Sequence, residues 1–393
     1  MVERVALFTG NYTLVADGVA HTLQRLVGYL QDRGIDVLVL SPQSDDPSQQ
    51  GPGSLVSVRS VQLPGRPEYR VALWPSPYTT RRLAQFDPDL LHVATPDLLG
   101  THSLHLARRW DVPVVATYHT HFSRYLQYYY LGWLEAPLNR YLRWFYQQCD
   151  LVCAPTEPIR GALAAMGIDT ELKIWGRGVN TQRFHPKWRS TTWRKGLGIG
   201  PDEVVITFVG RLVREKGLEI YADVLERLRD QGRSVQGLVV GDGPLRPTLE
   251  RRLPKALFAG HLEDRALWRA YASSDIFLFP SDSEAFGNVI VEAMASGLAI
   301  VAANQSGSSA HLDHERTGLL APPHDTDAFL RHTIRLLEEP GLRQRLGRTA
   351  RQRVEESYDW DATLARMAQY YEQALTVTNL SRAEMDGMEA TIA

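Results

Sequence analysis

Short apolar runs alternate with amphipathic stretches along almost the whole chain, and this alternation limits the possible folds more than any other feature. In the first half, strand-like runs occupy residues 4–9, 36–42, 90–96, 112–120 and 151–156. Between the first two runs, GVAHTLQRLVGYLQDRG (18–34) has helical spacing and ends at a glycine. Repeated strand–helix–strand units predict an α/β fold, with a parallel sheet covered by helices on both faces. The runs are nearly unbroken, as expected for strands that are buried on both sides.

The pattern pauses at residues 175–203, which are rich in Gly, Arg, Ser and Thr, and then restarts. Further strands are predicted at 204–212, 235–243, 256–260, 276–284 and 298–303. The restart indicates a second parallel sheet and therefore two domains, as expected for a chain of 393 residues. We predict Rossmann-like, doubly wound domains over 1–185 and 186–359. An amphipathic helix over 360–377 is predicted to join the first domain, and residues 378–393 to form a flexible tail.

Composition and charge exclude several classes of protein. A formal net charge of −2 gives no sign of a nucleic-acid-binding domain. Cys149 and Cys153 have no second pair of metal ligands near them, so we expect buried, reduced thiols. The first residues, MVERVALFTG, are too short and too charged for a signal peptide, and the sequence has no run of about 18 apolar residues. We therefore expect a cytoplasmic protein whose only membrane contact is peripheral, at the inner face of the cell membrane.

Two domains that face each other would place the carboxyl ends of both sheets around one central cleft, so site residues are expected directly after strands. The stretch SEAFGNVIVEAMASG (283–297) follows such a strand, with Glu284 in the polar loop and Glu292 in the helix that begins near Gly287. The amides expected at this helix N-terminus, where they suit a phosphate, belong to Phe286, Gly287, Asn288 and Val289. Each carboxylate can accept hydrogen bonds from the vicinal hydroxyls of a sugar or a ribose. The alternative is an ordinary capped helix with one exposed carboxylate.

The second stretch is VGRLVREKG (209–217), in which a strand ends and two cations, Arg211 and Lys216, stand in the loop before a helix. An arginine forks two oxygens and a lysine adds a point charge, so the pair suits a pyrophosphate. A solvated basic loop is the alternative interpretation. The nucleotide triphosphate motif G-x-x-x-x-G-K-[ST] is absent from the sequence.

Weaker signals come from two glycine turns and one histidine. Gly241 lies in VVGDGPLRPTLE, and Gly18 opens the first helix, where a missing side chain permits close approach by a phosphate or a sugar. His119 follows the strand at 112–120 and is expected to point into the cleft, although a single histidine is more often structural. The residues after it, Thr120, His121 and Arg124, are the candidates for contact with an acceptor. The sequence has no His/Cys cluster and no G-x-S-x-G serine turn.

In these motifs the chain resembles the retaining glycosyltransferases of family 4, which have the GT-B architecture of two Rossmann-like domains, from about residue 3 to 375. The most specific motif is E-x7-E, from Glu284 to Glu292, and FVGRLVREKG and VVGDGP accompany it. DGVAHTLQRLVGYLQDRG, YHTHFSRYL and WGRGVNTQRFHP resemble the branch of bacterial GDP-mannose-dependent α-mannosyltransferases and sulfoquinovosyltransferases. Two departures, His121 in place of a usual asparagine and NYTLVADG in place of a proline-rich segment, affect the predicted acceptor more than the donor.

The resemblance implies roles for the matching positions. Glu284 would bind hydroxyls of the transferred sugar, Glu292 the donor's ribose, and residues 258–262 the base. Arg211 and Lys216 would neutralise the diphosphate leaving group, with the amides of residues 286–289 beside it. Gly18 would line the phosphate site, and His119 would lie by the sugar and the reacting bond.

The implied reaction moves a hexosyl group, with retention, from a nucleotide diphosphate sugar to a hydroxyl of a lipid or glycan. GDP-mannose is the preferred donor, and a UDP-sugar-dependent glycolipid synthase is the alternative; an epimerase or a non-catalytic binder remains a third class. No cofactor and no metal are expected, because the cations would do the metal's work. The aromatic and arginine-rich segment 122–148 is either an amphipathic helix at a membrane surface or a helix packed inside the first domain.

Overall fold

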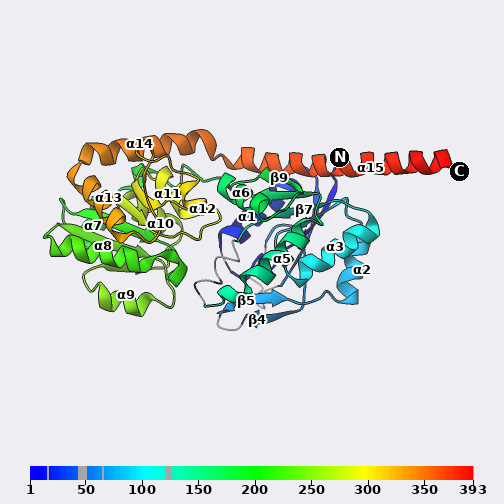
Figure 1. Cartoon of the computed structure of the whole chain (residues 1–393). Coiled ribbons are helices and arrows are strands. Elements are labelled where there is room, and N and C mark those ends of the chain that lie inside the picture. The colour runs from blue at the N-terminus through cyan, green and yellow to red at the C-terminus, as the bar shows by residue number, and fades with distance from the viewer. Residues whose placement is uncertain are drawn as a thin grey trace. The chain divides into compact units, whose positions relative to one another are not determined.

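The computed structural model describes residues 1–15, 17–42, 51–63, 66–120, 126, 128 and 130–392. These residues divide into two compact units (Figure 1). Met1–His119, Trp133–Gly176 and the chain from Asp361 onward form the first unit, and Arg177–Trp360 form most of the second. Apart from Thr120–Gly132, which is grouped with the second unit, the chain passes from the first unit to the second at Gly176/Arg177 and returns at Trp360/Asp361. The predicted boundary, 185/186, lies nine residues after the first of these crossings.

The first unit contains a seven-stranded sheet in the order β3-β2-β1-β6-β7-β8-β9, in which every neighbouring pair is parallel. Its strands are β1 (Arg4–Phe8), β2 (Asp36–Ser41), β3 (Ser54–Ser57), β6 (Leu90–Val93), β7 (Val114–Thr117), β8 (Leu151–Ala154) and β9 (Glu171–Ile174). The helices are α1 (Gly18–Gln31), α2 (Pro77–Phe86), α3 (Leu98–Trp110), α5 (Glu135–Tyr146), α6 (Glu157–Ala165) and α15 (Trp360–Ile392). A separate antiparallel hairpin pairs β4 (Ser60–Leu63) with β5 (Arg66–Ala72).

The second unit repeats the arrangement with a six-stranded parallel sheet in the order β12-β11-β10-β13-β14-β15. Its strands are β10 (Val204–Val209), β11 (Val235–Val240), β12 (Leu257–Gly260), β13 (Ile276–Phe279), β14 (Ala299–Ala303) and β15 (Leu319–Ala321). The helices are α7 (Thr191–Gly196), α8 (Leu218–Asp230), α9 (Arg246–Arg252), α10 (Asp264–Ala272), α11 (Asn288–Ala295), α12 (Ser306–Ser309), α13 (Thr326–Glu338) and α14 (Pro340–Ser357). The predicted pair of doubly wound parallel sheets is confirmed.

Both sheets have a point where the strand order changes direction, between β1 and β6 in the first unit and between β10 and β13 in the second. The connections that leave these two strands run to opposite faces of the sheet, so they separate at the carboxyl edge, where ligands bind in folds of this kind. The strands that the sequence did not predict are the short edge strands β3, β9 and β15 and the hairpin β4–β5. The edge strand β9 is half-buried at most positions, which removes the apolar run that marks an inner strand.

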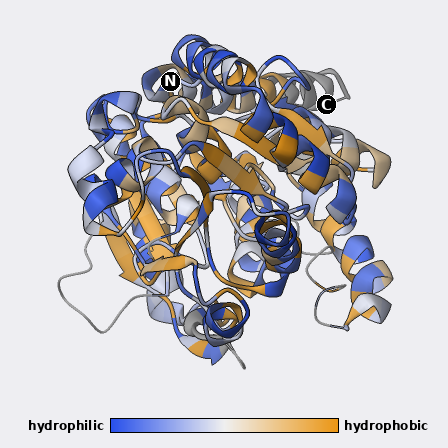
Figure 2. Ribbon diagram, turned by 90° about the vertical axis from the view of Figure 1, so that its left-hand side faces the viewer, coloured by the Kyte–Doolittle hydropathy of each residue, from blue (hydrophilic) through white to orange (hydrophobic). Residues whose placement is uncertain are grey.

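The inner strands form the cores of both units, as Figure 2 shows by the orange strands enclosed by helices of mixed colour. Strands β13 and β14 are buried at every residue, and so are β6, β7 and β8. Cys149 and Cys153 are buried and free, in agreement with the sequence prediction. One polar side chain, that of His92, stands in the middle of β6 and has no exposed surface.

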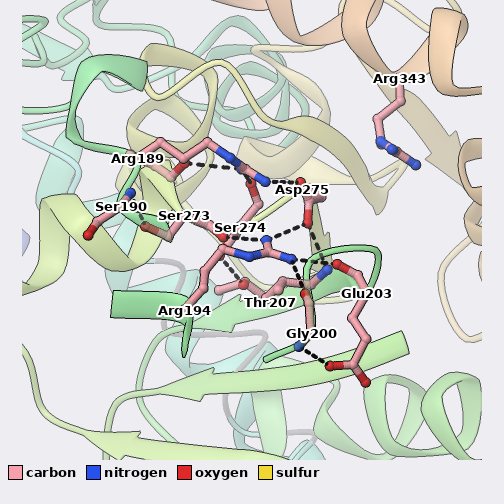
Figure 3. Close-up of polar contacts among 12 residues, drawn as sticks. Arg189, Ser190, Arg194, Gly200, Glu203, Thr207, Ser273, Ser274, Asp275 and Arg343 are labelled. Atoms are coloured by element: carbon pink, nitrogen blue, oxygen red, sulfur yellow. Dashed lines mark hydrogen bonds and ion pairs between the residues drawn. The ribbon is translucent and has the colours of Figure 1, made fainter. Parts of the chain in front are cut away.

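A polar network fixes residues 189–203 to the amino edge of the second sheet, opposite the edge expected to bind ligands (Figure 3). Asp275, which directly precedes β13, accepts hydrogen bonds from the Arg194 guanidinium at 3.0 Å and from the Val205 amide at 2.8 Å. Arg189 contacts the second carboxylate oxygen of Asp275 at 2.8 Å. Arg194 is 5% exposed, so this is a buried ion pair whose donors also reach backbone carbonyls. The network holds α7 and the start of β10 in place.

The last helix, α15, runs from Trp360 to Ile392 (red in Figure 1) and belongs to the first unit from Asp361 onward. It begins where the predicted helix over 360–377 begins and extends beyond the predicted end. Residues 378–392, for which we expected a flexible tail, continue this helix. Their low apolar content removed the pattern on which the prediction depended.

Candidate active site

Two loops of the second unit that follow neighbouring strands bring the predicted site residues together. Arg211 and Lys216 lie in the loop after β10, and Glu284 lies in the loop after β13, so both loops leave the sheet at its change of direction. Lys216 belongs to a short 3₁₀ turn, Arg214–Lys216, that ends at Gly217. Gly217 has φ 67°, and a side chain there would press on the backbone of Pro280, directly after β13. The close approach of the two loops therefore requires glycine at this position.

Lys216 and Glu284 form an ion pair between the ammonium nitrogen and Oε1 of the carboxylate. The two side chains are 11% and 14% exposed, so the pair is largely screened from water. Ser281 donates a further hydrogen bond to the same carboxylate oxygen at 2.7 Å. Burial by itself raises the pKa of Glu284, but Lys216, Ser281 and Arg211 together hold it below its ordinary value. Glu284 is therefore a carboxylate, able to accept hydrogen bonds from hydroxyl groups.

The loop that carries the two cations is tied to the loop that carries Glu284. The hydroxyl of Ser283 donates to the main-chain carbonyl of Glu215 at 3.1 Å, and the Ser281 hydroxyl, whose proton goes to Glu284, lies 3.2 Å from the same carbonyl. The Glu215 side chain is 1% exposed and lies 3.9 Å from the guanidinium of Arg211, which is itself 43% exposed. Arg211 thus stands at the surface of the site with a buried carboxylate behind it, while Lys216 lies deeper.

Helix α11 begins at Asn288, and Gly287 occupies the N-cap position in the left-handed conformation, with φ 84°. This agrees with the predicted helix start. No side chain of the described residues caps this terminus. The helix dipole and the amides of the first turn therefore favour an anion there. His311 binds the carbonyl of Phe286 through Nε2, and Nδ1 of the same ring lies 2.8 Å from the hydroxyl of Tyr358. Burial lowers the pKa of His311 to about 4, so the ring is neutral and donates to the Phe286 carbonyl. The loop before α11 is therefore held at its backbone.

Glu292 lies on α11, and its Oε2 accepts a hydrogen bond of 2.9 Å from the hydroxyl of Tyr271, at the end of α10. Tyr271 is fully buried and packs edge-on against Phe184, with ring centroids 5.6 Å apart. Burial raises the pKa of Glu292 to about 7, against the lowering effect of the tyrosine hydroxyl. The two glutamates of the motif therefore differ: Glu284 is ionised, and Glu292 titrates near neutrality.

Gly241, after β11, has φ 127°, and a side chain there would overlap the carbonyl group of Gly210, directly after β10. Gly243, two residues later, approaches the backbone of Leu212 in the same way. The backbone of this glycine turn therefore packs directly against the backbone of the loop that carries Arg211. Gly241 shapes the site through this loop, and direct contact with a donor stays a prediction.

In the first unit, His119 follows β7, and its Nε2 lies 2.9 Å from the hydroxyl of Thr117. Gly18 is the first residue of α1, as predicted, but the carboxylate of Asp17 caps this terminus by accepting from the amides of Val19 and Ala20, both at 2.9 Å. An anion at this position would compete with the carboxylate of Asp17 for these amides. Thr120 follows His119 in an irregular segment, and His121 and Arg124 lie outside the described residues.

Sequence reasoning missed the side chains that support the site. Ser281 and Glu215 are next to predicted residues but carry no motif of their own, and Tyr271 and His311 lie on other elements. The only local signal was the run SDSE, in which serines flank the loop carboxylate. No group of three or more His, Cys, Asp or Glu side chains that could hold a metal ion occurs within the described part of the chain. No described helix is long and apolar enough to cross a membrane.

Comparison with known proteins gives consistent matches over both units. Residues 16–183 match the model of Glycosyltransferase Family 4, and residues 189–353 match that of the glycosyl transferases group 1. The chain is 32% identical over 374 residues to the sulfoquinovosyl transferase of Arabidopsis thaliana, covering 93% of this chain and 72% of that protein. It is 32% identical over 356 residues to the GDP-mannose-dependent alpha-mannosyltransferase of Mycobacterium tuberculosis, covering 89% and 92% of the two chains.

Comparison with solved structures shows the same fold. The sucrose-phosphate synthase of Thermosynechococcus elongatus superposes with a TM-score of 0.78 at 21% identity, over 95% of this chain and 100% of that one. HepE of Anabaena, solved in complex with UDP and glucose, superposes with a TM-score of 0.76 at 18% identity, over 94% and 100%. The two parallel-sheet units and these likenesses define the class of the protein as a glycosyltransferase with the GT-B fold. Within that class, the chain belongs to glycosyltransferase family 4.

Proposed function

We propose that the protein transfers a hexosyl group from a nucleotide diphosphate sugar to a hydroxyl group, with retention of the anomeric configuration. The observation that carries this proposal is the buried Lys216–Glu284 pair beside the uncapped N-terminus of α11. A cation, a carboxylate and a helix N-terminus on adjacent loops suit the diphosphate and the hydroxyls of one such donor. Glu292, one turn along the same helix, would accept hydrogen bonds from a ribose.

The same residues suggest how the transfer proceeds. Negative charge grows on the departing diphosphate, and Lys216, Arg211 and the amides at the start of α11 would stabilise it as fixed positive groups. Loss of one such group costs on the order of 2.7–4 kcal/mol in comparable sites. Because Glu284 is paired with Lys216 and holds its proton weakly, it suits sugar hydroxyls better than proton donation. In this proposal a phosphate oxygen of the leaving group takes the proton of the acceptor hydroxyl, and no metal ion is needed.

For the donor we propose GDP-mannose, because a GDP-mannose-dependent alpha-mannosyltransferase matches the chain over 92% of its own length. The relation to a sulfoquinovosyl transferase supports a UDP-sugar as the second candidate. The site residues assigned in this proposal would bind the phosphates and the sugars of the donor, and these groups do not select a base.

For the acceptor we propose a lipid at a membrane surface. Exposed aromatic side chains support this just before α5, where Tyr130 is 83% and Trp133 74% exposed. Trp144 is exposed on α5 as well, whereas Leu142 and Phe145 pack into the core. The helix is therefore packed along one side and presents aromatic groups on another, a distribution that favours peripheral contact with lipid. Sedimentation with anionic lipid vesicles tests this, and a protein that stays wholly in the supernatant contradicts it.

Thermal unfolding with GDP, UDP or ADP at millimolar concentration tests the donor. A ligand that binds only the folded state adds about 2.7 kcal/mol of stability at a hundredfold excess over Kd. A shift with GDP alone supports GDP-mannose, and a shift with UDP alone supports the second candidate. The absence of any shift would contradict a working nucleotide-sugar site. Release of nucleotide diphosphate from the matching sugar donor, measured with and without EDTA, then tests turnover and its independence from metal ions.

A further inference from the structure

Four residues of the first unit form a continuous line of hydrogen bonds that ends at His119. The hydroxyl of Tyr371, on α15, lies 2.6 Å from Nδ1 of His92, on β6. Nε2 of His92 lies 3.0 Å from the hydroxyl of Thr117, at the end of β7. The same hydroxyl lies 2.9 Å from Nε2 of His119. We refer to Tyr371, His92, Thr117 and His119 as the relay.

The inner part of the relay is sealed from water. His92 is 0% exposed, and Thr117 and Tyr371 are each 1% exposed. Trp175 stands edge-on to both imidazole rings, with centroids 6.4 Å from His92 and 6.1 Å from His119. Its indole nitrogen donates to the carbonyl of Thr363, on α15, at 3.0 Å. The returning helix thus fixes the relay at Tyr371 and supports the tryptophan that packs on it.

The protons in the relay can be placed by counting donors and acceptors. Burial lowers the pKa of His92 to about 3, so its ring is neutral, with one nitrogen donating and the other accepting. Among the described residues, His92 is the one hydrogen-bond partner of the Tyr371 hydroxyl. The tyrosine proton is satisfied only if Tyr371 donates to Nδ1, since an unsatisfied buried donor is costly. His92 then carries its proton on Nε2 and donates to the oxygen of Thr117.

Once Thr117 accepts from His92, its own hydroxyl proton points to Nε2 of His119. A neutral His119 that accepts at Nε2 carries its proton on Nδ1. The geometry points to a positioning role for Tyr371, His92 and Thr117: they hold His119 as the Nδ1–H tautomer. In this tautomer Nδ1 carries the ring proton, so this nitrogen can donate a hydrogen bond and cannot act as a base.

The Nδ1–H tautomer of His119 has a consequence for catalysis, which rests on the proposed function. His119 would then act toward substrate as a hydrogen-bond donor and not as a base. It would not take the acceptor proton, which leaves that task to the phosphate oxygen. The helix α15 would then be required for activity because it supplies Tyr371, although the helix itself contributes no residue to the phosphate-binding loops.

The experiment is a nitrogen-15 measurement on the full-length protein with labelled histidine, made without substrate. Protonated and unprotonated imidazole nitrogens resonate at well-separated shifts, so each tautomer is read directly, and the signals of His92 and His119 are assigned by substituting each in turn. We expect Nε2–H for His92 and Nδ1–H for His119 in the unmodified protein. His119 as the Nε2–H tautomer would overturn the proposal.

Substitutions then test the direction of the relay. Tyr371→Phe should release both histidines into mixed tautomers, whereas Thr117→Val should release His119 alone and leave His92 as Nε2–H. Tyr370→Phe is the matched control, because its hydroxyl donates instead to the carbonyl of Ile174, at 3.0 Å, and should change neither ring. Unchanged signals in Tyr371→Phe would contradict the proposal. A failure of donor turnover with the expected tautomers would count against the proposed function only.

Discussion

The affinity for the nucleotide-sugar donor should depend on pH through Glu292. Its carboxylate must be ionised to accept hydrogen bonds from two ribose hydroxyls, and burial raises its pKa to about 7. The ionised form dominates above pH 7 and is lost as the pH falls. Between pH 8 and pH 6 the ionised fraction drops from about 0.9 to about 0.1, so the donor should bind about tenfold more weakly at pH 6, equivalent to about 1.4 kcal/mol.

Titration calorimetry with the intact nucleotide sugar measures this effect. The intact donor is used because its diphosphate is esterified at both ends and does not titrate near neutrality, whereas a free nucleotide diphosphate does. Glu292→Gln is the control, since an amide keeps the shape but has no proton to lose, and its affinity should be lower and independent of pH over this range. Tyr271→Phe removes the hydrogen bond that lowers the pKa of Glu292, so its transition should move to higher pH. Equal affinity of the unmodified protein at pH 6 and pH 8 would refute the assignment of Glu292 to the ribose.

Four further substitutions, one of them a control, probe the site and the fold. Lys216→Met should lower donor turnover about 10²–10³-fold, because it removes the buried cation of the site, and a loss below tenfold in initial rates would argue against that role. Asp275→Ala should reduce the free energy of unfolding in urea by about 3–5 kcal/mol, because it leaves the buried guanidinium of Arg194 without its carboxylate. Asp327→Ala, which breaks an exposed ion pair, should leave the urea midpoint unchanged, and equal midpoints for both variants would contradict the argument. Gly241→Ala should raise the KM for the donor and lower the melting temperature, because its side chain would displace the neighbouring loop; unchanged values of both would show that the loop adapts.

Much of the fold was predictable because the strands of a parallel sheet have a recognisable sequence pattern. Strands such as β13 and β14 are buried on both faces, so they read as unbroken apolar runs bounded by polar loops. The edge strand β9 was not predictable in this way, since a half-exposed strand carries little apolar pattern. The end of α15 has few apolar residues, so its sequence carries no helical pattern. The predicted domain boundary was later than the observed crossing at Gly176/Arg177 because composition changes gradually through the connecting segment.

The sequence by itself determined the local features of the site. Glu284, Gly287 and Glu292 lie within one strand–loop–helix unit, where spacing alone relates a loop carboxylate, a helix N-terminus and a second carboxylate. The spacing of residues in the sequence does not show which side chain each of these groups contacts. The ion pair of Glu284 with Lys216 joins residues 68 positions apart, and it exists because two neighbouring strands end at the same edge of the sheet.

The tertiary structure also decided the protonation of these groups. A carboxylate and an imidazole have ordinary pKa values in any sequence, and only burial and nearby partners change them. The two glutamates of one motif therefore differ, because Glu284 has a buried cation beside it and Glu292 has only a tyrosine hydroxyl. His92 and Tyr371, 279 positions apart, meet because the last helix returns to the first unit. The sequence determines which chemical groups are present and their local order. The packing of distant segments determines the protonation state of each group and the partner to which it is hydrogen-bonded.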